Sequence, residues 1–234
     1  MISIVIPMYN EEKIAAETIK AVREYCDKTF PGDYEAIFVD DGSRDLTLEI
    51  AKSHADGERI KTITYSGNRG KGFAVRTGML AASGEYIFFT DCDLAYGLEV
   101  ISSGLDILKN KPSAGVVIGS RRLHPEGYAS YTKLRKLMSG AFFKILTLYG
   151  GIHHTDCQSG IKGFRKSAAK SIFEKCETNG FAFDFEILLR AEKMNINVEE
   201  MPVKIINHRA STVNVLKDSI KMLREVRRIK KSVK

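Results

Sequence analysis

The first half of the chain alternates short apolar runs with longer segments that carry apolar residues at helical spacing. The short runs are Ile2–Ile6, Ala36–Val39, Ile60–Thr64, Tyr86–Phe89 and Gly115–Ile118. Each is too short for a helix and is bounded by turn residues, as expected of strands buried on both faces. The predicted helices between them are Glu11–Lys28, Asp45–His54, Gly72–Ala82 and Leu98–Lys109. This alternation predicts an α/β fold with a mainly parallel, doubly wound sheet.

The second half is less regular. Its predicted helices are Lys133–Tyr149, Phe183–Met194 and Val213–Ser232, and its predicted strands are Gly160–Arg165 and Val198–Ile206. No internal repeat or low-complexity linker interrupts it. We therefore expect a single domain over residues 1–212, followed by a basic amphipathic C-terminal helix over residues 213–234.

Composition narrows the class of protein. Hydrophobic residues make up 44% and charged residues 28% of the 234 positions, as in ordinary globular proteins. No window reaches the roughly 18–20 uninterrupted apolar residues that a membrane-spanning helix needs. The start of the chain does not have the pattern of a signal peptide. Four scattered cysteines are expected to be free thiols in a reducing cytoplasm.

The net charge of +7 is concentrated at the C-terminal end. Residues 217–234 contain eight Lys or Arg against two acidic residues, while the rest of the chain is close to neutral. This distribution indicates a surface interaction made by one element, and it does not favour a nucleic-acid groove across the fold.

Polar clusters follow four of the predicted strands. They are Pro7-Met8-Tyr9-Asn10-Glu11-Glu12, Asp40-Asp41-Gly42-Ser43, Thr90-Asp91-Cys92-Asp93 and Gly119-Ser120-Arg121-Arg122. Any one of them alone is compatible with a helix cap or a turn. All four are expected at the carboxyl edge of one sheet, where doubly wound sheets bind ligands. The sequence therefore predicts a binding site at that edge.

Asp91 and Asp93 are the sharpest pair in these clusters. In an extended segment their side chains point to the same side, where two carboxylates repel each other unless a cation or a proton separates them. Such oxygen ligands suit Mg²⁺ or Mn²⁺ bridging to substrate phosphates. The alternative is an acidic turn that caps the next helix. Nearby, Gly67–Gly72 offers backbone N–H groups and Lys71 to an anion, although a simple turn and helix cap fits equally well.

These clusters, in this order, resemble glycosyltransferase family 2, inverting enzymes with a nucleotide-binding A-type fold. The matching segments are Val5–Glu11, Val39–Ser43, Asn68–Gly72 and Asp91–Asp93. Within the family the chain is similar to the branch that makes dolichyl- or polyprenyl-phosphate glucose and mannose. That narrower likeness rests on Gly119–Arg121, Asp156–Gly160, Phe183–Glu186 and His208–Thr212.

The resemblance implies roles for particular residues. Pro7, Tyr9, Glu11 and Asp41, with Asp40 beside them, would line the nucleoside pocket. Asp91, Cys92 and Asp93 would lie at the diphosphate and its Mg²⁺ or Mn²⁺. Asp93, Arg121 and Arg209 would be the catalytic groups, the two arginines meeting donor or acceptor phosphates. Lys71, Gln158, Asp184 and Glu186 would contact the acceptor or the sugar, with a buried or capping carboxylate as the alternative for the last two.

The chain also departs from the family pattern. Thr212 stands where mannosyl-type relatives have Lys, Cys92 where Ala is common, and Ser159 where the glucosyl type often has Cys. The donor is therefore expected to be UDP-glucose or GDP-mannose, with the choice left open.

The expected reaction is transfer of a hexose, with inversion, to a lipid phosphate at the inner face of the cell membrane. A phosphate monoester needs no general base because it is already largely ionised at neutral pH. The C-terminal helix would lie on an anionic bilayer, or it would simply pack on the body. The alternatives are a family 2 transferase with a soluble or polysaccharide acceptor and Asp184 as base, and a nucleotide-sensing or nucleic-acid-binding module. The acidic clusters disfavour the last because they repel a polyanion.

Overall fold

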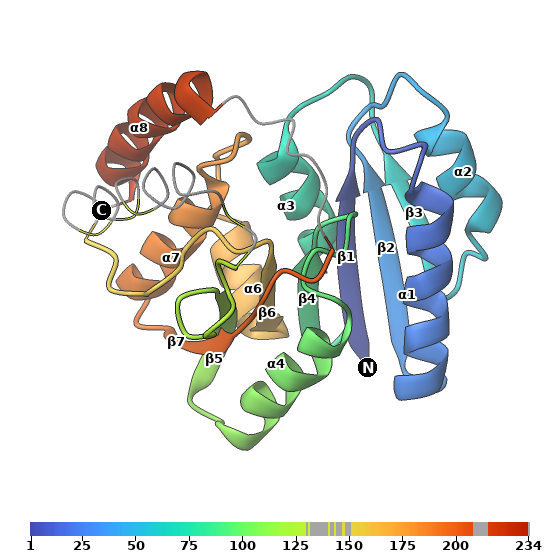
Figure 1. Cartoon of the computed structure of the whole chain (residues 1–234), viewed down its shortest axis with the longest axis horizontal. Coiled ribbons are helices and arrows are strands. Elements are labelled where there is room, and N and C mark those ends of the chain that lie inside the picture. Colours follow the sequence, from blue (N-terminus) through green and yellow to red (C-terminus); the bar gives the residue numbers. More distant parts are fainter. Residues whose placement is uncertain are drawn as a thin grey trace.

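A computed structural model of the chain has a seven-stranded sheet in the order β3-β2-β1-β4-β6-β5-β7 (Figure 1). It describes residues 1–129, 131, 140, 143, 147, 151–207 and 215–233, with side chains in the last range from residue 224 onward. The strands are β1 (Ile2–Met8), β2 (Tyr34–Asp40), β3 (Ile60–Thr64), β4 (Tyr86–Thr90), β5 (Ala114–Ser120), β6 (Ile161–Arg165) and β7 (Asn197–Pro202).

The sheet is mainly parallel, as predicted. β1 pairs in parallel with β2 and β4, β2 with β3, and β5 with β7. β6 is the exception, since it runs antiparallel to both β4 and β5. All seven residues of β1 and of β2 are buried, which explains why the centre of each strand, Ile4–Ile6 and Ala36–Val39, is a continuous apolar run.

Helices cover both faces of the sheet (Figure 1). They are α1 (Ala15–Thr29), α2 (Thr47–His54), α3 (Lys71–Ala81), α4 (Glu99–Asn110), α6 (Lys166–Phe173), α7 (Phe183–Lys193) and α8 (Val215–Ser232). One core joins α1, α2 and α4 to one face of the strands, and the other joins α3, α6, α7 and α8 to the opposite face. Ile4 and Val5 are neighbours on β1 and belong to different cores, as the two-residue period of a strand requires.

The elements follow the predicted order with small shifts at their ends. The run 60–64 coincides with β3, whereas α1 begins four residues later than expected and β7 ends four residues earlier. α6 was not predicted. The predicted helix 133–149 lies almost entirely outside the described residues, so it stays a prediction. The four cysteines are buried free thiols, as predicted.

Over the residues whose side chains are described, 224–233, the C-terminal segment packs against the body through apolar side chains. Val226 is fully buried, Ile229 is 1% exposed, and both belong to the core that includes α7. The expected apolar edge toward a bilayer is therefore wrong for this part of α8, because these side chains already cover the protein core. Among the described helices, none combines the length and apolar character needed to cross a membrane.

Candidate active site

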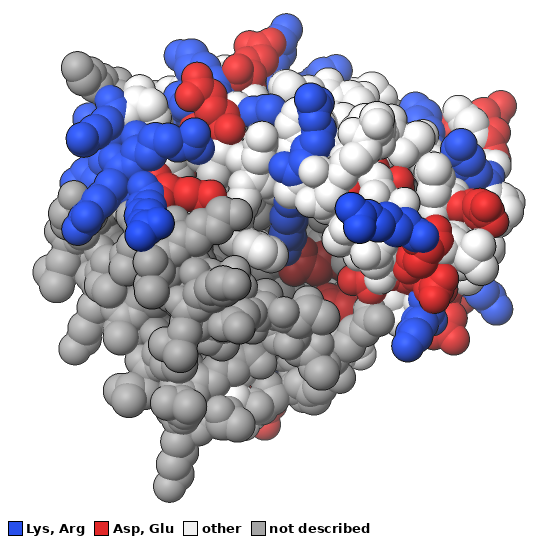
Figure 2. Space-filling view, turned by 90° about the horizontal axis from the view of Figure 1, so that it is seen from above, with Lys and Arg blue, Asp and Glu red and all other residues white. Residues whose placement is uncertain are grey.

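Loops from the carboxyl ends of β1, β2 and β4 meet at one edge of the sheet. Figure 2 looks down onto this edge and shows acidic side chains recessed in the middle of the face, next to basic ones. The loops contact each other directly: the Asn10 N–H donates to Ser43 Oγ at 3.0 Å, and the Glu11 N–H donates to Thr47 Oγ1 at 2.7 Å. The edge predicted from the sequence is thus assembled in the structure.

Asp91 and Asp93 lie in a tight turn directly after β4. The Leu94 N–H donates to the Asp91 carbonyl at 3.0 Å, and the Ala95 N–H donates to Asp93 Oδ1 at 3.1 Å. Leu94 has a φ of 47°, which is uncommon for a residue other than glycine. The expectation of an extended segment is therefore wrong, because the strand ends at Thr90. In this turn the two carboxylates are still close enough for the charge of Asp91 to act on Asp93.

The electrostatics of this turn are those of crowded carboxylates. Burial raises the pKa of Asp93 above its ordinary value, and the negative charge of Asp91 raises it further, with a smaller contribution from Glu11. Oδ1 of Asp91 is buried, and among the described residues it has no partner other than Lys71. Its charge is met by Lys71, whose Nζ lies 2.6 Å from that oxygen. The turn therefore favours a positive charge, which Lys71 supplies in this structure.

This arrangement fits a divalent cation. Within the described residues, no cluster of three or more His, Cys, Asp or Glu side chains forms a complete metal cage. Mg²⁺ is ordinarily held by only one or two carboxylates, together with waters and substrate phosphates, so a pair is sufficient. Asp91 and Asp93 would hold the ion, because their crowded carboxylate oxygens are the hard ligands that such cations prefer.

Gly160 makes room for Asp91. A Cβ on Gly160 would lie 2.7 Å from Cγ of Asp91 and would press directly on Oδ2. Gly160 immediately precedes β6, the strand that runs antiparallel beside β4. The carboxylate therefore rests on bare backbone, and any side chain at position 160 must displace it.

A second ion pair, Lys162–Asp184, lies close to the Lys71–Asp91 ion pair. Lys162 on β6 is fully buried, and its Nζ contacts Asp184 Oδ1 at 2.6 Å and the Ser159 carbonyl at 2.8 Å. Burial raises the pKa of Asp184, and the charges of Lys162 and Lys71 oppose that rise. Asp184 at the start of α7 is thus electrostatically joined to Lys71, as well as to Lys162.

The glycine-rich loop before α3 is held by Asp41. This carboxylate accepts hydrogen bonds from the Tyr65 hydroxyl, the Asn68 amide and the backbone N–H groups of Arg69 and Gly70, at 2.8 to 2.9 Å. Asp41 is only 3% exposed. Its oxygens accept from these four donors, and the expected nucleoside contact of Asp41 stays a prediction. Those two N–H groups are likewise taken by Asp41, so they are not available to an anion.

The other residues predicted to contact the nucleotide sugar divide into two groups. Tyr9 is exposed and Glu11 is partly exposed at the edge, whereas Pro7 is buried in β1. Asp40 is buried and accepts from Thr64 Oγ1 at 3.0 Å. The Cys92 side chain is buried in the core beside α1, so only its backbone can face a nucleotide sugar.

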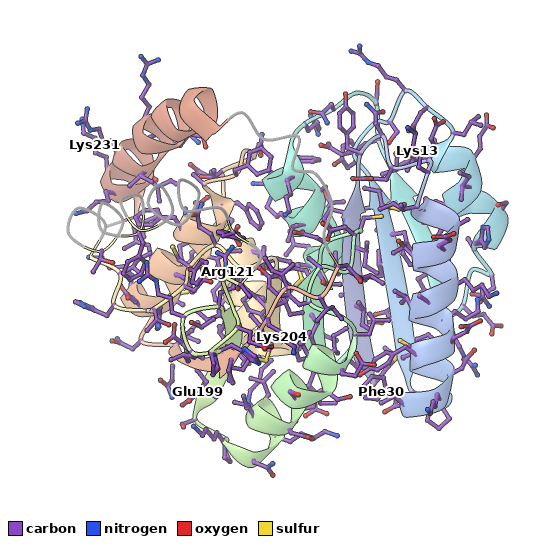
Figure 3. All side chains as sticks on the ribbon, viewed as in Figure 1. Lys13, Phe30, Arg121, Glu199, Lys204 and Lys231 are labelled. Carbon is purple, nitrogen blue, oxygen red and sulfur yellow. The ribbon has the colours of Figure 1, made fainter. Side chains whose placement is uncertain are left out.

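Arg121 lies at the end of β5, near the centre of the molecule in Figure 3. Its Nε and Nη2 donate to the two oxygens of Asp156 at 2.6 and 2.8 Å, and its Nη1 donates to the Tyr131 hydroxyl at 2.7 Å. Burial by itself would raise the pKa of Asp156, but Arg121 lowers it below its ordinary value. A hollow of about 600 Å³ lies beside Arg121 and is also lined by Arg122, His124 and Tyr128.

The remaining predicted contacts have mixed outcomes. Glu186 on α7 accepts from the backbone N–H groups of Glu177 and Thr178 and from Arg190, and it is 1% exposed. This position matches the alternative of a buried, capping carboxylate and differs from a sugar contact. The Gln158 N–H donates to Asp156 Oδ1 at 3.1 Å. Arg209 lies outside the described residues, so its role stays a prediction.

Sequence reasoning missed Lys162 and the role of Gly160. A signal for Lys162 was present, since a lysine between Ile161 and Phe164 interrupts a short apolar strand. A lysine is almost never fully buried unless it is paired, so its place in that strand indicates a buried partner. The role of Gly160 depends on how β6 lies beside β4, which the local pattern does not reveal.

The chain matches the model of the family "Glycosyl transferase family 2" over residues 3–173. Two curated relatives, both named dolichyl-phosphate beta-glucosyltransferase, come from Dictyostelium discoideum and Saccharomyces cerevisiae. The first is 32% identical over 98% of this chain and 73% of its own length, and the second is 31% identical over 96% and 72%. A solved structure of glucosyl-3-phosphoglycerate synthase from Mycobacterium tuberculosis, in complex with Mn²⁺, UDP and phosphoglyceric acid, has the same fold. It aligns with a TM-score of 0.72 at 18% identity, over 100% of this chain and 78% of that one. The fold, the acidic turn at its carboxyl edge and the match over most of the sequence agree, and the chain belongs to glycosyl transferase family 2.

Proposed function

We propose that this chain transfers glucose from UDP-glucose to a polyprenyl or dolichyl phosphate, with inversion, using Mg²⁺ or Mn²⁺ on Asp91 and Asp93. The observation that supports the donor half is the crowded carboxylate turn at the ligand edge of the sheet, where burial and the charge of Asp91 raise the pKa of Asp93. The names of the two curated relatives support the sugar and the acceptor.

On the donor side, the leaving group is a nucleoside diphosphate whose negative charge grows as the sugar departs. A divalent cation bound there supplies Lewis-acid stabilisation of that charge. Lys71 provides a second positive charge at the same place, since its Nζ is already beside Asp91. Lys162 keeps Asp184 oriented through their 2.6 Å contact, so the position of the Asp184 carboxylate is fixed.

On the acceptor side, a phosphate monoester is already an ionised nucleophile near neutral pH and needs orientation more than a base. Arg121, Arg122 and His124 line the hollow that follows β5. Within the part of the chain that the structure describes, Asp156 and Tyr131 engage three donors of the Arg121 guanidinium, and the remaining two of its five would serve a phosphate. The Asp156 pair also fixes the plane of the guanidinium, which favours bidentate binding of a phosphate group.

Attachment to the membrane surface is assigned to the exposed side of α8. Five exposed cations lie on that side: Arg224, Arg227, Arg228, Lys230 and Lys231. They gather at one corner of the face that contains the site (Figure 2). Because Val226 and Ile229 are buried, the attraction of this part of α8 to a bilayer is electrostatic, at about 1 kcal/mol for each cation near an anionic surface.

The membrane proposal is tested by co-sedimentation with phosphatidylserine-containing vesicles. A triple variant with Arg224, Arg228 and Lys231 changed to Glu should lose most binding, and wild-type binding should weaken at high salt. The matched control changes Lys13, Lys28 and Lys52 to Glu, which alters the net charge equally on exposed lysines. Lys28 lies on α1 and Lys52 on α2, on the side of the molecule opposite α8 (Figure 1), and Lys13 lies on that same side (Figure 3). Equal loss in both variants, or retention in the α8 variant, contradicts a specific role for α8.

The reaction is tested by offering radiolabelled UDP-glucose with polyprenyl phosphate and Mn²⁺. Label should enter the lipid phase, and EDTA or the Asp91→Asn and Asp93→Asn substitutions should abolish the transfer. Phosphoglyceric acid serves as a soluble phosphorylated acceptor in a parallel arm. Label in a soluble product but not in lipid would overturn the lipid acceptor and support the soluble-acceptor alternative.

A further inference from the structure

The backbone of Lys71 is held in place beside the candidate metal ligand, Asp91. It is the first residue of α3, directly after Gly70, whose N–H is bound by Asp41. The next residue, Gly72, donates its N–H to the Asn179 carbonyl at 2.8 Å. A Cβ on Gly70 would lie 2.5 Å from the same carbonyl oxygen, so the two loops are in direct contact. The backbone that carries Lys71 is therefore anchored on both sides.

The Lys71 ammonium group occupies the place that a divalent cation would need. Its Nζ lies 2.6 Å from Asp91 Oδ1, and that oxygen has no other partner in the described residues. An ammonium group and a divalent ion repel each other strongly at such distances in a partly buried site. Asp91 therefore cannot hold Lys71 closely and bind the metal with that oxygen at the same time.

We propose that Lys71 is an internal competitor for the metal and is transferred from Asp91 to the donor diphosphate when metal and nucleotide bind together. The inference rests on the proposed function, because it requires the metal on Asp91 and Asp93. It makes metal binding and nucleotide binding mutually dependent: each ligand increases the affinity for the other by the same factor.

The charges of the site support this exchange. Asp91, Asp93 and Asp184 face Lys71 and Lys162, so the five groups carry a formal charge of −1. A divalent cation alone would change this to +1 and would displace Lys71 without giving it a new partner. Asp184 is already paired with Lys162, so it is not an equivalent partner. The diphosphate of a nucleotide sugar brings two negative charges, which restore −1 and give Lys71 a new anionic contact.

The test measures Mn²⁺ affinity by electron paramagnetic resonance of the free ion, with and without UDP as the probe nucleoside diphosphate. For the wild type, UDP should increase the Mn²⁺ affinity by a factor in the range of about 5 to 150, as is typical of coupled sites. Lys71→Met should bind Mn²⁺ alone about tenfold more tightly than the wild type, and UDP should add much less to its affinity. Lys71→Arg keeps the positive charge and should behave like the wild type.

Lys52→Met is the matched control, because it removes one exposed lysine on α2 that makes no contact with Asp91. Lys71→Gln provides a second neutral variant, and a thermal melt of each protein checks that it is folded. Unchanged Mn²⁺ affinity in both neutral Lys71 variants overturns the inference, as does equal tightening in Lys52→Met. Failure of the wild type to bind Mn²⁺ even with UDP instead overturns the metal site of the proposed function.

Discussion

Removal of Lys162 should destabilise the fold through the partner it leaves behind. In Lys162→Met, the apolar side chain fills a similar volume, but the Asp184 carboxylate loses the ammonium group that lies 2.6 Å away. The Asp184 side chain is only 11% exposed, so water replaces little of that interaction. Breaking one side of a buried ion pair typically costs about 3–5 kcal/mol.

The stability lost in Lys162→Met should depend on pH and on whether Asp184 is present. Burial already raises the pKa of Asp184, and the loss of Lys162 removes a charge that opposes the rise. A raised carboxyl pKa destabilises the ionised protein at high pH, and this penalty disappears as pH falls through the folded-state pKa. Lys162→Met should therefore lose least stability in acid. The double variant Lys162→Met/Asp184→Leu leaves no unpaired charge, so it should lose much less than the sum of the two single variants.

Thermal and urea unfolding, followed by circular dichroism, measure this cycle. For a chain of this size, about 1 kcal/mol corresponds to about 2–4 °C, so Lys162→Met should lower Tm by roughly 6–20 °C at neutral pH. The double-mutant coupling energy should be about 2 kcal/mol or more. Additive losses, with no coupling between the two positions, would refute the reasoning that Lys162 and Asp184 stabilise the fold as a buried ion pair.

Three further predictions concern other parts of the molecule. Gly160→Ala should weaken Mn²⁺-dependent UDP binding at least about tenfold, measured by calorimetry, because the new Cβ displaces Asp91; unchanged affinity contradicts the packing. Burial by itself would raise the pKa of Glu35, but hydrogen bonds led by Lys61 lower it to about 2. Glu35→Gln should therefore cost up to about 3 kcal/mol at neutral pH, and its difference from the wild type in urea unfolding should shrink as pH falls from about 4.5 toward 2. The four buried cysteines should react with a thiol reagent only after unfolding, since burial raises the pKa of each thiol; rapid labelling of the native chain would contradict this.

Much of the fold follows from local patterns. The run Ile60–Thr64 coincides with a strand because a short β-branched segment between turns has one favourable conformation. The short helix Lys166–Phe173 was missed, since its eight residues follow a strand directly and offer barely two turns of apolar periodicity. The antiparallel direction of β6 was also hidden, because a buried strand has the same pattern in either direction.

The candidate site was predicted in its location and only partly in its roles. Asp91 and Asp93 were recognised because two carboxylates at a strand end are costly without a cation. The saturation of Asp41 by four donors depends on how residues 65–70 fold back over β2, which no local spacing encodes. The pairing of Arg121 with Asp156 joins positions 35 residues apart and likewise needed the tertiary structure.

The most direct test of the account is a donor comparison with polyprenyl phosphate as acceptor. Radiolabelled UDP-glucose and GDP-mannose are offered in turn with Mn²⁺, and label in the lipid phase is counted for the wild type and for Asp91→Asn. The account predicts labelling from UDP-glucose that EDTA and Asp91→Asn abolish, with little or none from GDP-mannose. Labelling that persists in Asp91→Asn with EDTA would contradict the central claim that a metal on this turn supports the transfer.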